Sequence, residues 1–172
     1  MDTLAARDDV GLLITLWASA LTAAGAWLSL AGPWPAWLAG QVLLGFAFTQ
    51  WFVVVHECGH RTLFRTRWLN GAVGALAGLL ALLPAGAWRV VHARHHRWTG
   101  WQDVDPTTRA RAPRARSRLS LALLDLAWRL GVPFVSLHYR AGTFWRPGWV
   151  LPHAPPGRRR RVLLWLLAHH LA

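Results

Sequence analysis

Five of the nine histidines in this sequence fall into two groups with helical spacing. His56 and His60 are four residues apart, and His92, His95 and His96 stand at positions i, i+3 and i+4. Residues three and four apart share one face of a helix, so each group presents its imidazoles together. Imidazole suits zinc, iron, copper and nickel. The pattern therefore predicts a metal site on which all five histidines converge.

Three carboxylates lie close to these groups in the sequence. Glu57 follows His56, and Asp103 and Asp105 follow the second group. Each could orient a ligand imidazole by accepting a hydrogen bond from its other ring nitrogen. Asp103 and Asp105 could equally cap a turn before Pro106. The remaining histidines are interpreted as loop, interface or helix residues outside the metal site: His138, His153, His169 and His170.

The metal itself is open to two interpretations. Residues 56–60, HECGH, have the spacing of the HExxH motif of zinc proteases, in which the glutamate is the general base. A zinc site of that kind needs one further ligand, whereas this sequence offers a further trio. Five imidazoles in two groups fit two metal ions better than one. A binuclear centre is therefore the favoured hypothesis, and an intramembrane zinc protease is the remote alternative.

Apolar and basic residues alternate in long blocks. The sequence is 54% hydrophobic yet has a net charge of +12, with 19 arginines and no lysine. Membrane spans alternate with basic cytoplasmic loops in this way, whereas a nucleic-acid-binding protein does not need uncharged stretches between its arginines. A single cysteine, Cys58, excludes an internal disulfide and a CxxC motif. We therefore expect an integral membrane protein with no nucleic-acid partner.

The first half of the chain predicts two membrane spans. No charged residue occurs from residue 10 to residue 55, and the sequence GPWP at 32–35 interrupts this stretch. A span needs about 20 residues, and proline removes a backbone donor. We predict antiparallel spans at about 11–30 and 36–55. The first is expected to be retained, because the residues before it lack the basic region of a signal peptide.

The second half predicts shorter elements. The apolar segment 71–87 is short and rich in glycine, and a re-entrant or interfacial course would keep both histidine groups on one side. Residues 119–136 fit an interfacial helix, and residues 162–172 start a third span after Arg158–Arg161. The predicted fold class is all-α, one integral membrane helical bundle. Its N-terminus, both histidine groups and the arginine run are expected to be cytoplasmic.

The histidine groups resemble the histidine boxes of the membrane fatty acid desaturase family. Residues 56–64, HECGHRTLF, are similar to the first box, and residues 92–99, HARHHRWT, are similar to the second, HxxHH. The DVDP at 103–106 resembles the residues that come after the second box in acyl-lipid desaturases. This resemblance covers roughly residues 10–110. The same superfamily also holds hydroxylases, carotenoid ketolases and alkane monooxygenases.

The resemblance implies oxygen-dependent desaturation of fatty acyl chains in lipid metabolism, at two iron ions with O2 as co-substrate. The implied iron ligands are His56, His60, His92, His95 and His96. It also implies a membrane lipid or acyl substrate, and an electron donor such as ferredoxin or a cytochrome b5-type protein. The site is expected on the cytoplasmic side of a bacterial inner membrane. The basic face could dock the donor, or its arginines could only set topology and meet anionic lipid.

One part of the family pattern has no counterpart in this sequence. Family members carry a third histidine box, and this sequence has none. We therefore expect a chain truncated at its C-terminal side. The alternatives within the superfamily are a hydroxylase, a carotenoid ketolase or an inactive remnant.

Overall fold

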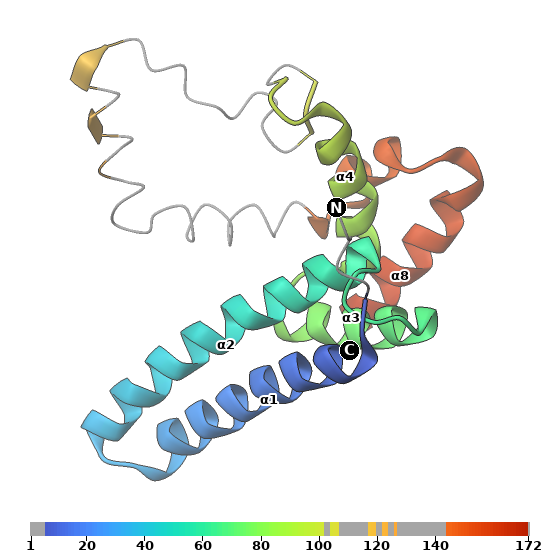
Figure 1. Ribbon diagram of the computed structural model, residues 1–172. Helices are drawn as coiled ribbons and strands as arrows, with labels where there is room; N and C mark the ends of the chain where they lie inside the picture. The colour runs from blue at the N-terminus through green and yellow to red at the C-terminus, as the bar shows by residue number, and fades with distance from the viewer. Residues whose placement is uncertain are drawn as a thin grey trace, which may run out of the picture. The chain divides into compact units, whose positions relative to one another are not determined.

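The structure is a computed structural model that describes residues 6–101, 104–106, 117–119, 122–123, 126 and 144–171 (Figure 1). The chain divides into two compact units, Met1–Ala85 and Gly86–Ala172. The described residues form helices and irregular segments and include no strand. Among these described residues, two helices are long and apolar enough to cross a membrane, or up to three if one broken pair counts as a span. The predicted all-α membrane fold is therefore confirmed, whereas a single domain stays a prediction.

The first unit begins with a helical hairpin, α1 (Asp8–Ala31) followed by α2 (Trp34–His60). At 1.5 Å per residue the two helices are about 36 and 40 Å long, enough to cross a hydrocarbon core of about 30 Å. They lie side by side in Figure 1. Hydropathy alone ends the second span near residue 55, but α2 continues to His60. The first histidine group therefore occupies the last turns of this helix.

Small residues let α1 and α2 approach each other closely. A methyl group added at Gly25 would come within 2.9 Å of Leu44 Cγ and 3.1 Å of the Gly40 carbonyl oxygen. Such close approach is typical of helices that associate within a membrane, where burial from water does not drive packing. Buried glycines and alanines recur every seventh residue on both helices: Gly11, Ala18 and Gly25 on α1, Gly40 and Ala47 on α2.

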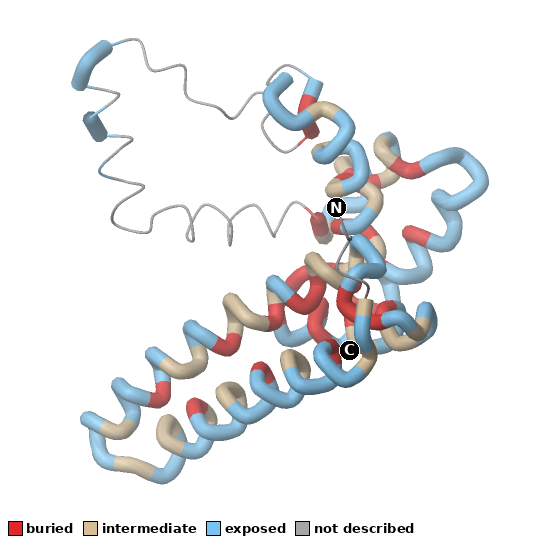
Figure 2. The backbone as a smooth tube through the Cα atoms, in the orientation of Figure 1, coloured by how far each residue is buried: buried red, intermediate tan, exposed pale blue. Residues whose placement is uncertain are grey.

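The outward faces of α1 and α2 are apolar and exposed, as Figure 2 shows by their pale blue colour. Leu13 and Phe46, for example, are 66% and 61% exposed. Extended exposed apolar surfaces mark membrane contact. Trp27, Trp34 and Trp37 are exposed near the turn between the helices, where aromatic side chains suit the headgroup level.

The end of α2 is closed by a left-handed residue. Arg61 has φ 64°, and the N–H groups of Arg61 and Thr62 donate to the carbonyls of Cys58 and Glu57 at 3.1 and 3.0 Å. This pair of bonds is the Schellman motif, which satisfies carbonyls that a helix end otherwise leaves open. The motif sets where α2 stops, and with it the position of the first histidine group.

The turn after α2 is hydrogen-bonded to the start of α1 and to the start of the next helix. Buried Asn70, in α3 (Arg67–Leu80), donates to the Phe64 carbonyl at 2.7 Å and accepts from the Phe64 N–H at 3.2 Å. Thr66 donates through its N–H and Oγ1 to the Asp8 carboxylate, at 3.0 and 2.6 Å. The start of α1, the end of α2 and the start of α3 are therefore bonded together at one end of the hairpin.

The α3 helix packs on α2, and a second left-handed residue follows its end. Leu82 has φ 50°, and the Leu83 N–H donates to the Gly78 carbonyl at 2.7 Å. At 14 residues α3 is about 21 Å long, too short to cross the hydrocarbon core by itself. The break falls inside the segment 71–87. Whether that segment is re-entrant or interfacial stays a prediction.

The described part of the second unit contains α4, which begins at the boundary of the units (Ala85–Trp98), and α8 (Arg159–Leu171). Between them the described residues also form α7 (Pro147–Val150) and two short 3-10 turns, η1 (Leu151–His153) and η2 (Pro156–Arg158). Gly86 lies against the ring of Trp165, where an added methyl group would approach within 3.1 Å. Arg94 Nε donates to the His153 carbonyl at 3.2 Å. The predicted interfacial helix 119–136 lies mostly outside the described residues, and the predicted start of a third span lies within α8.

Candidate metal centre

His56 and His60 share one face of α2, as their spacing predicted. Their ring centroids are 4.6 Å apart, in an edge-to-face arrangement. His56 Nδ1 lies 2.9 Å from Glu57 Oε1. The tautomer that donates from Nδ1 to this carboxylate has its lone pair on Nε2, the form in which imidazole ligates a metal.

Glu57 is itself held in place by the turn after α2. Thr62 Oγ1 lies 2.6 Å from Glu57 Oε2 and 3.1 Å from the Glu57 carbonyl oxygen. The two carboxylate oxygens thus meet different partners, His56 on one side and Thr62 on the other. Sequence reasoning assigned no role to Thr62. No sequence signal marked Thr62, because an arginine at position 61 does not reveal the left-handed backbone that places Thr62 beside Glu57.

The second group is compact on α4. The rings of His92, His95 and His96 have centroid separations of 5.7 Å (His92–His95), 4.4 Å (His92–His96) and 5.6 Å (His95–His96). The Nε2 atoms of His92 and His96 face each other at 2.9 Å. Trp88, one turn earlier, stacks on the His92 ring at 4.1 Å and 19°. Sequence reasoning missed Trp88, although its i, i+4 spacing to His92 was a usable signal.

The facing nitrogens provide a test of whether these residues fit a metal. Two ligands at right angles on one ion, each at about 2.0–2.1 Å, have their donor atoms about 2.9 Å apart. The separation of His92 Nε2 and His96 Nε2 is 2.9 Å. The α4 pair therefore has a separation that fits two adjacent coordination positions of a single ion, and that equally fits a hydrogen bond between the two rings. The convergence of both histidine groups on one centre stays a prediction.

Asp105 contacts His95 of the second histidine group. Its Oδ2 lies 2.7 Å from His95 Nδ1, and the residue is only 1% exposed. A buried carboxylate is costly unless it is paired and hydrogen-bonded, and His95 provides a partner. The Asp105 N–H also donates to the Trp101 carbonyl at 2.9 Å, so the residue belongs to a turn as well. Asp103 lies outside the described residues.

The histidines that were predicted to lie outside the metal site contact groups other than the two histidine groups. His169 Nδ1 and His170 Nδ1 lie 2.9 and 2.8 Å from the carbonyls of Trp165 and Leu166, one turn back along α8. His153 lies against the ring of Trp149, with centroids 5.5 Å apart. These contacts are typical of helix and interface histidines. His138 lies outside the described residues.

Comparison with known proteins adds an independent finding. A family model described as fatty acid desaturase matches residues 31–172. The chain is 42% identical over 73 residues to the sn-1 oleoyl-lipid 12-desaturase of Picosynechococcus sp., which covers 42% of this chain and 21% of that protein. It is 34% identical over 127 residues to the sn-1 oleoyl-lipid 12-desaturase of Synechocystis sp., covering 70% of this chain and 33% of that protein.

The name of a third relative includes the word ferredoxin. The chain is 39% identical over 64 residues to the sn-1 acyl-lipid omega-3 desaturase (ferredoxin) of Nostoc sp., which covers 37% of this chain and 18% of that protein. The chain thus spans a third or less of the length of these three relatives. No solved structure matches it.

Proposed function

This chain belongs to the fatty acid desaturase family, and from that premise we propose that it takes part in the oxygen-dependent desaturation of acyl chains in membrane lipids. The observation that carries the proposal is the pair of facing ring nitrogens of His92 and His96, 2.9 Å apart. Neutral imidazole suits iron as well as zinc, copper and nickel, and we propose iron because the family to which the chain belongs is a di-iron family. A zinc protease, which the spacing of the first group also allowed, needs one further ligand and gives no role to the rest of this second group.

We assign the metal ligands to both α2 and α4. His92 and His96 would hold one ion through Nε2, His95 would bind from the same helix, and His56 and His60 would bind from α2. Each of the four histidines His56, His60, His92 and His96 offers one ring nitrogen. Two irons need more imidazoles than the two proposed on α2 or the three proposed on α4, so we propose that both helices contribute ligands. Bound iron, with O2, would supply the strong oxidant that an unactivated methylene requires.

The remaining residues of the proposed site orient these ligands. Asp105 accepts a hydrogen bond from the Nδ1–H of His95, and this holds the tautomer whose Nε2 can bind metal. Glu57 does the same for His56, and Thr62 steadies Glu57. Trp88 fixes the plane of the His92 ring by stacking on it. Asp103 stays a candidate for a similar role.

Substrate, donor and location complete the proposal. The relatives are named for acyl lipids, which agrees with a protein whose helices can lie among lipid chains. We propose ferredoxin, which the name of the Nostoc relative includes, or a cytochrome b5-type protein as the electron donor. We place the site at the cytoplasmic side of a bacterial inner membrane, because arginines 61, 65 and 67 follow the first histidine group at once.

Metal content tests the ligand assignment directly. The purified chain, expressed with iron supplied, should contain iron rather than zinc by elemental analysis. His96→Ala should lower the iron content strongly, whereas His153→Ala, a histidine in the same unit outside the proposed set, should leave it unchanged. A zinc-loaded chain, or equal iron in the two variants, would contradict the assignment.

Lipid analysis tests the reaction. Cells that express the chain joined to the C-terminal region of a relative that carries the third histidine box, together with a ferredoxin and its reductase, should accumulate additional double bonds in their lipids, measured by gas chromatography of the fatty acids. The His96→Ala variant should abolish that gain while the His153→Ala variant keeps it. Iron binding without any change in the lipids would separate the metal site from the proposed activity.

A further inference from the structure

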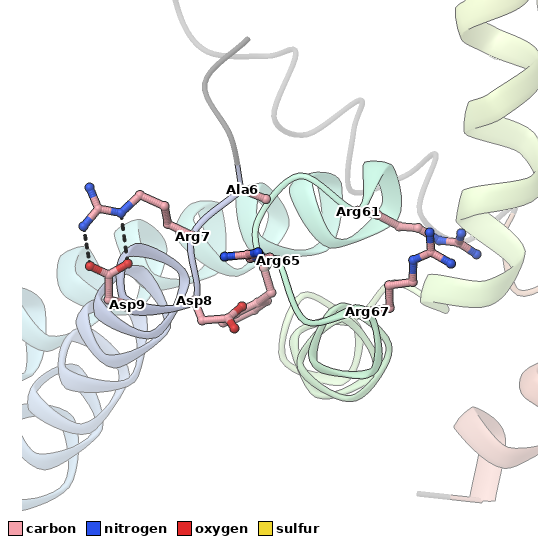
Figure 3. A pocket seen from close by; sticks show the side chains of 8 residues that line it. Ala6, Arg7, Asp8, Asp9, Arg61, Arg65 and Arg67 are labelled. Atoms are coloured by element: carbon pink, nitrogen blue, oxygen red, sulfur yellow. Dashed lines mark hydrogen bonds and ion pairs between the residues drawn. The ribbon is translucent and has the colours of Figure 1, made fainter. Parts of the chain in front are cut away.

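An open hollow lies in the first unit, where α1 begins and α2 ends (Figure 3). Its volume is about 840 Å³, and charged residues supply most of its lining. Because α1 and α2 can cross a membrane, the ends that meet here lie where hydrocarbon gives way to headgroups. The charged lining residues are Arg7, Asp8, Asp9, Arg61, Arg65 and Arg67.

The positive charges of this hollow are only partly neutralised. Arg7 forms two bonds with the Asp9 carboxylate, at 2.5 and 3.1 Å. Asp8 is bonded to Thr66 and lies beside Arg65 in Figure 3.

Arg61 and Arg67 are placed differently, because their side chains point toward the same place in Figure 3. Among the described residues, no carboxylate forms an ion pair with either of them. Two guanidinium groups are thus directed together without a carboxylate partner in this part of the chain.

The backbone under these two arginines is fixed. Arg61 occupies the left-handed position of the Schellman motif that ends α2, and Arg67 is the first residue of α3. The first turn of α3 contains no acidic residue, and the Thr66 side chain does not cap it because its hydroxyl donates to Asp8. The start of α3 therefore adds partial positive charge to the same place.

We propose that Arg61 and Arg67 bind the phosphate of a membrane phospholipid. The planar guanidinium fork matches phosphate oxygens with two parallel hydrogen bonds, and two converging forks suit a single phosphate. The position of the hollow, at the level of the headgroups, selects a lipid phosphate over a soluble anion. This site goes beyond the proposed function, since a phospholipid can bind here whether or not the chain carries out desaturation.

Native mass spectrometry of the full chain in detergent, with phosphatidylglycerol added, tests the site. The informative variant is Arg61→Gly with Arg67→Gln, because glycine adopts the left-handed backbone at position 61 freely. Its affinity for phosphatidylglycerol should fall about tenfold or more, the expected loss of charge-assisted hydrogen bonds. Arg158→Gln with Arg159→Gln removes the same charge elsewhere and should leave the affinity unchanged. Circular dichroism confirms that both variants keep their helix content.

Three further binding measurements decide which chemical group the site recognises. Diacylglycerol, which lacks the phosphate, should bind far more weakly than phosphatidylglycerol, and millimolar inorganic phosphate should not displace the lipid. Arg61→Lys with Arg67→Lys should bind with intermediate affinity, because lysine keeps the charge and loses the fork. Equal binding of diacylglycerol, displacement by inorganic phosphate, or an equal loss in the Arg158 and Arg159 control would overturn the proposal.

Discussion

Replacing Asp105 by asparagine should weaken iron binding by about 10- to 100-fold while α4 keeps its helical structure. Asp105 Oδ2 lies 2.7 Å from His95 Nδ1, and the carboxylate is almost completely buried. A short bond to a buried anion favours the tautomer with the proton on Nδ1. That tautomer leaves Nε2 in the form that binds metal. The substitution therefore acts through His95, because Asp105 is a positioning residue for that ligand.

The magnitude follows from what asparagine keeps and what it loses. The amide oxygen can still accept from His95 Nδ1, so the shape of the contact survives while its charge is lost. A change of 10- to 100-fold in affinity corresponds to about 1.4 to 2.7 kcal/mol. Asp105→Ala removes the acceptor and also leaves a small cavity. It should therefore lie at the upper end of this range and lower the stability of the second unit as well.

An anaerobic Fe(II) titration against a competing chelator measures this affinity. Asp9→Asn is the matched control, because it removes an exposed carboxylate in the other unit and should leave iron affinity unchanged. Equal affinity of the Asp105→Asn variant and the unmodified chain would refute the positioning role. A lower melting temperature with unchanged iron affinity would show that Asp105 serves only the turn at 101–105.

Two further predictions concern the packing that positions the first histidine pair. Asn70→Ala should lower the free energy of unfolding in detergent by about 2 to 4 kcal/mol, because it leaves the buried N–H and carbonyl of Phe64 without their partner; a loss near zero would mean that water replaces Asn70. Gly74→Ala should cost about 1 to 3 kcal/mol, because its methyl group would meet Cys58 Cβ at 2.9 Å. Gly71→Ala, on the same helix with open space around it, should be neutral or stabilising by up to about 1 kcal/mol. Unfolding followed by circular dichroism measures the stability of all three variants. Equal effects of Gly74→Ala and Gly71→Ala would contradict the close contact of α2 and α3.

The sequence predicted the hairpin because two strong signals agreed. A stretch from residue 10 to residue 55 without charge fixed the apolar length, and Gly32-Pro33 marked its break. Helical spacing also placed both histidine groups on helices, and they lie on α2 and α4. Hydropathy could not show that α2 continues through polar His56 and Glu57. Its end depends on backbone bonds from Arg61 and Thr62, which have no hydrophobic signature.

The partners of polar side chains were harder to predict. From the sequence, Asp105 was equally suited to cap a turn or to orient a histidine, because an aspartate before Pro106 fits either role. Its carboxylate lies on His95, ten residues earlier. The bond from Thr66 to Asp8 joins residues 58 apart, and no local pattern can reveal a contact that depends on two helices packing in register.

The two histidine groups are positioned by different physical means, which bears on how each should respond to perturbation. On α4, His92 stacks on Trp88 and His95 bonds to buried Asp105, so this group is held by packing within its own unit. On α2, His56 depends on Glu57, and Glu57 depends on Thr62 in the turn. That turn is also bonded to α1 and α3. Changes at the start of α1 or α3 should therefore reach His56 through hydrogen bonds, whereas the histidines of α4 should respond chiefly to changes in the core around Trp88.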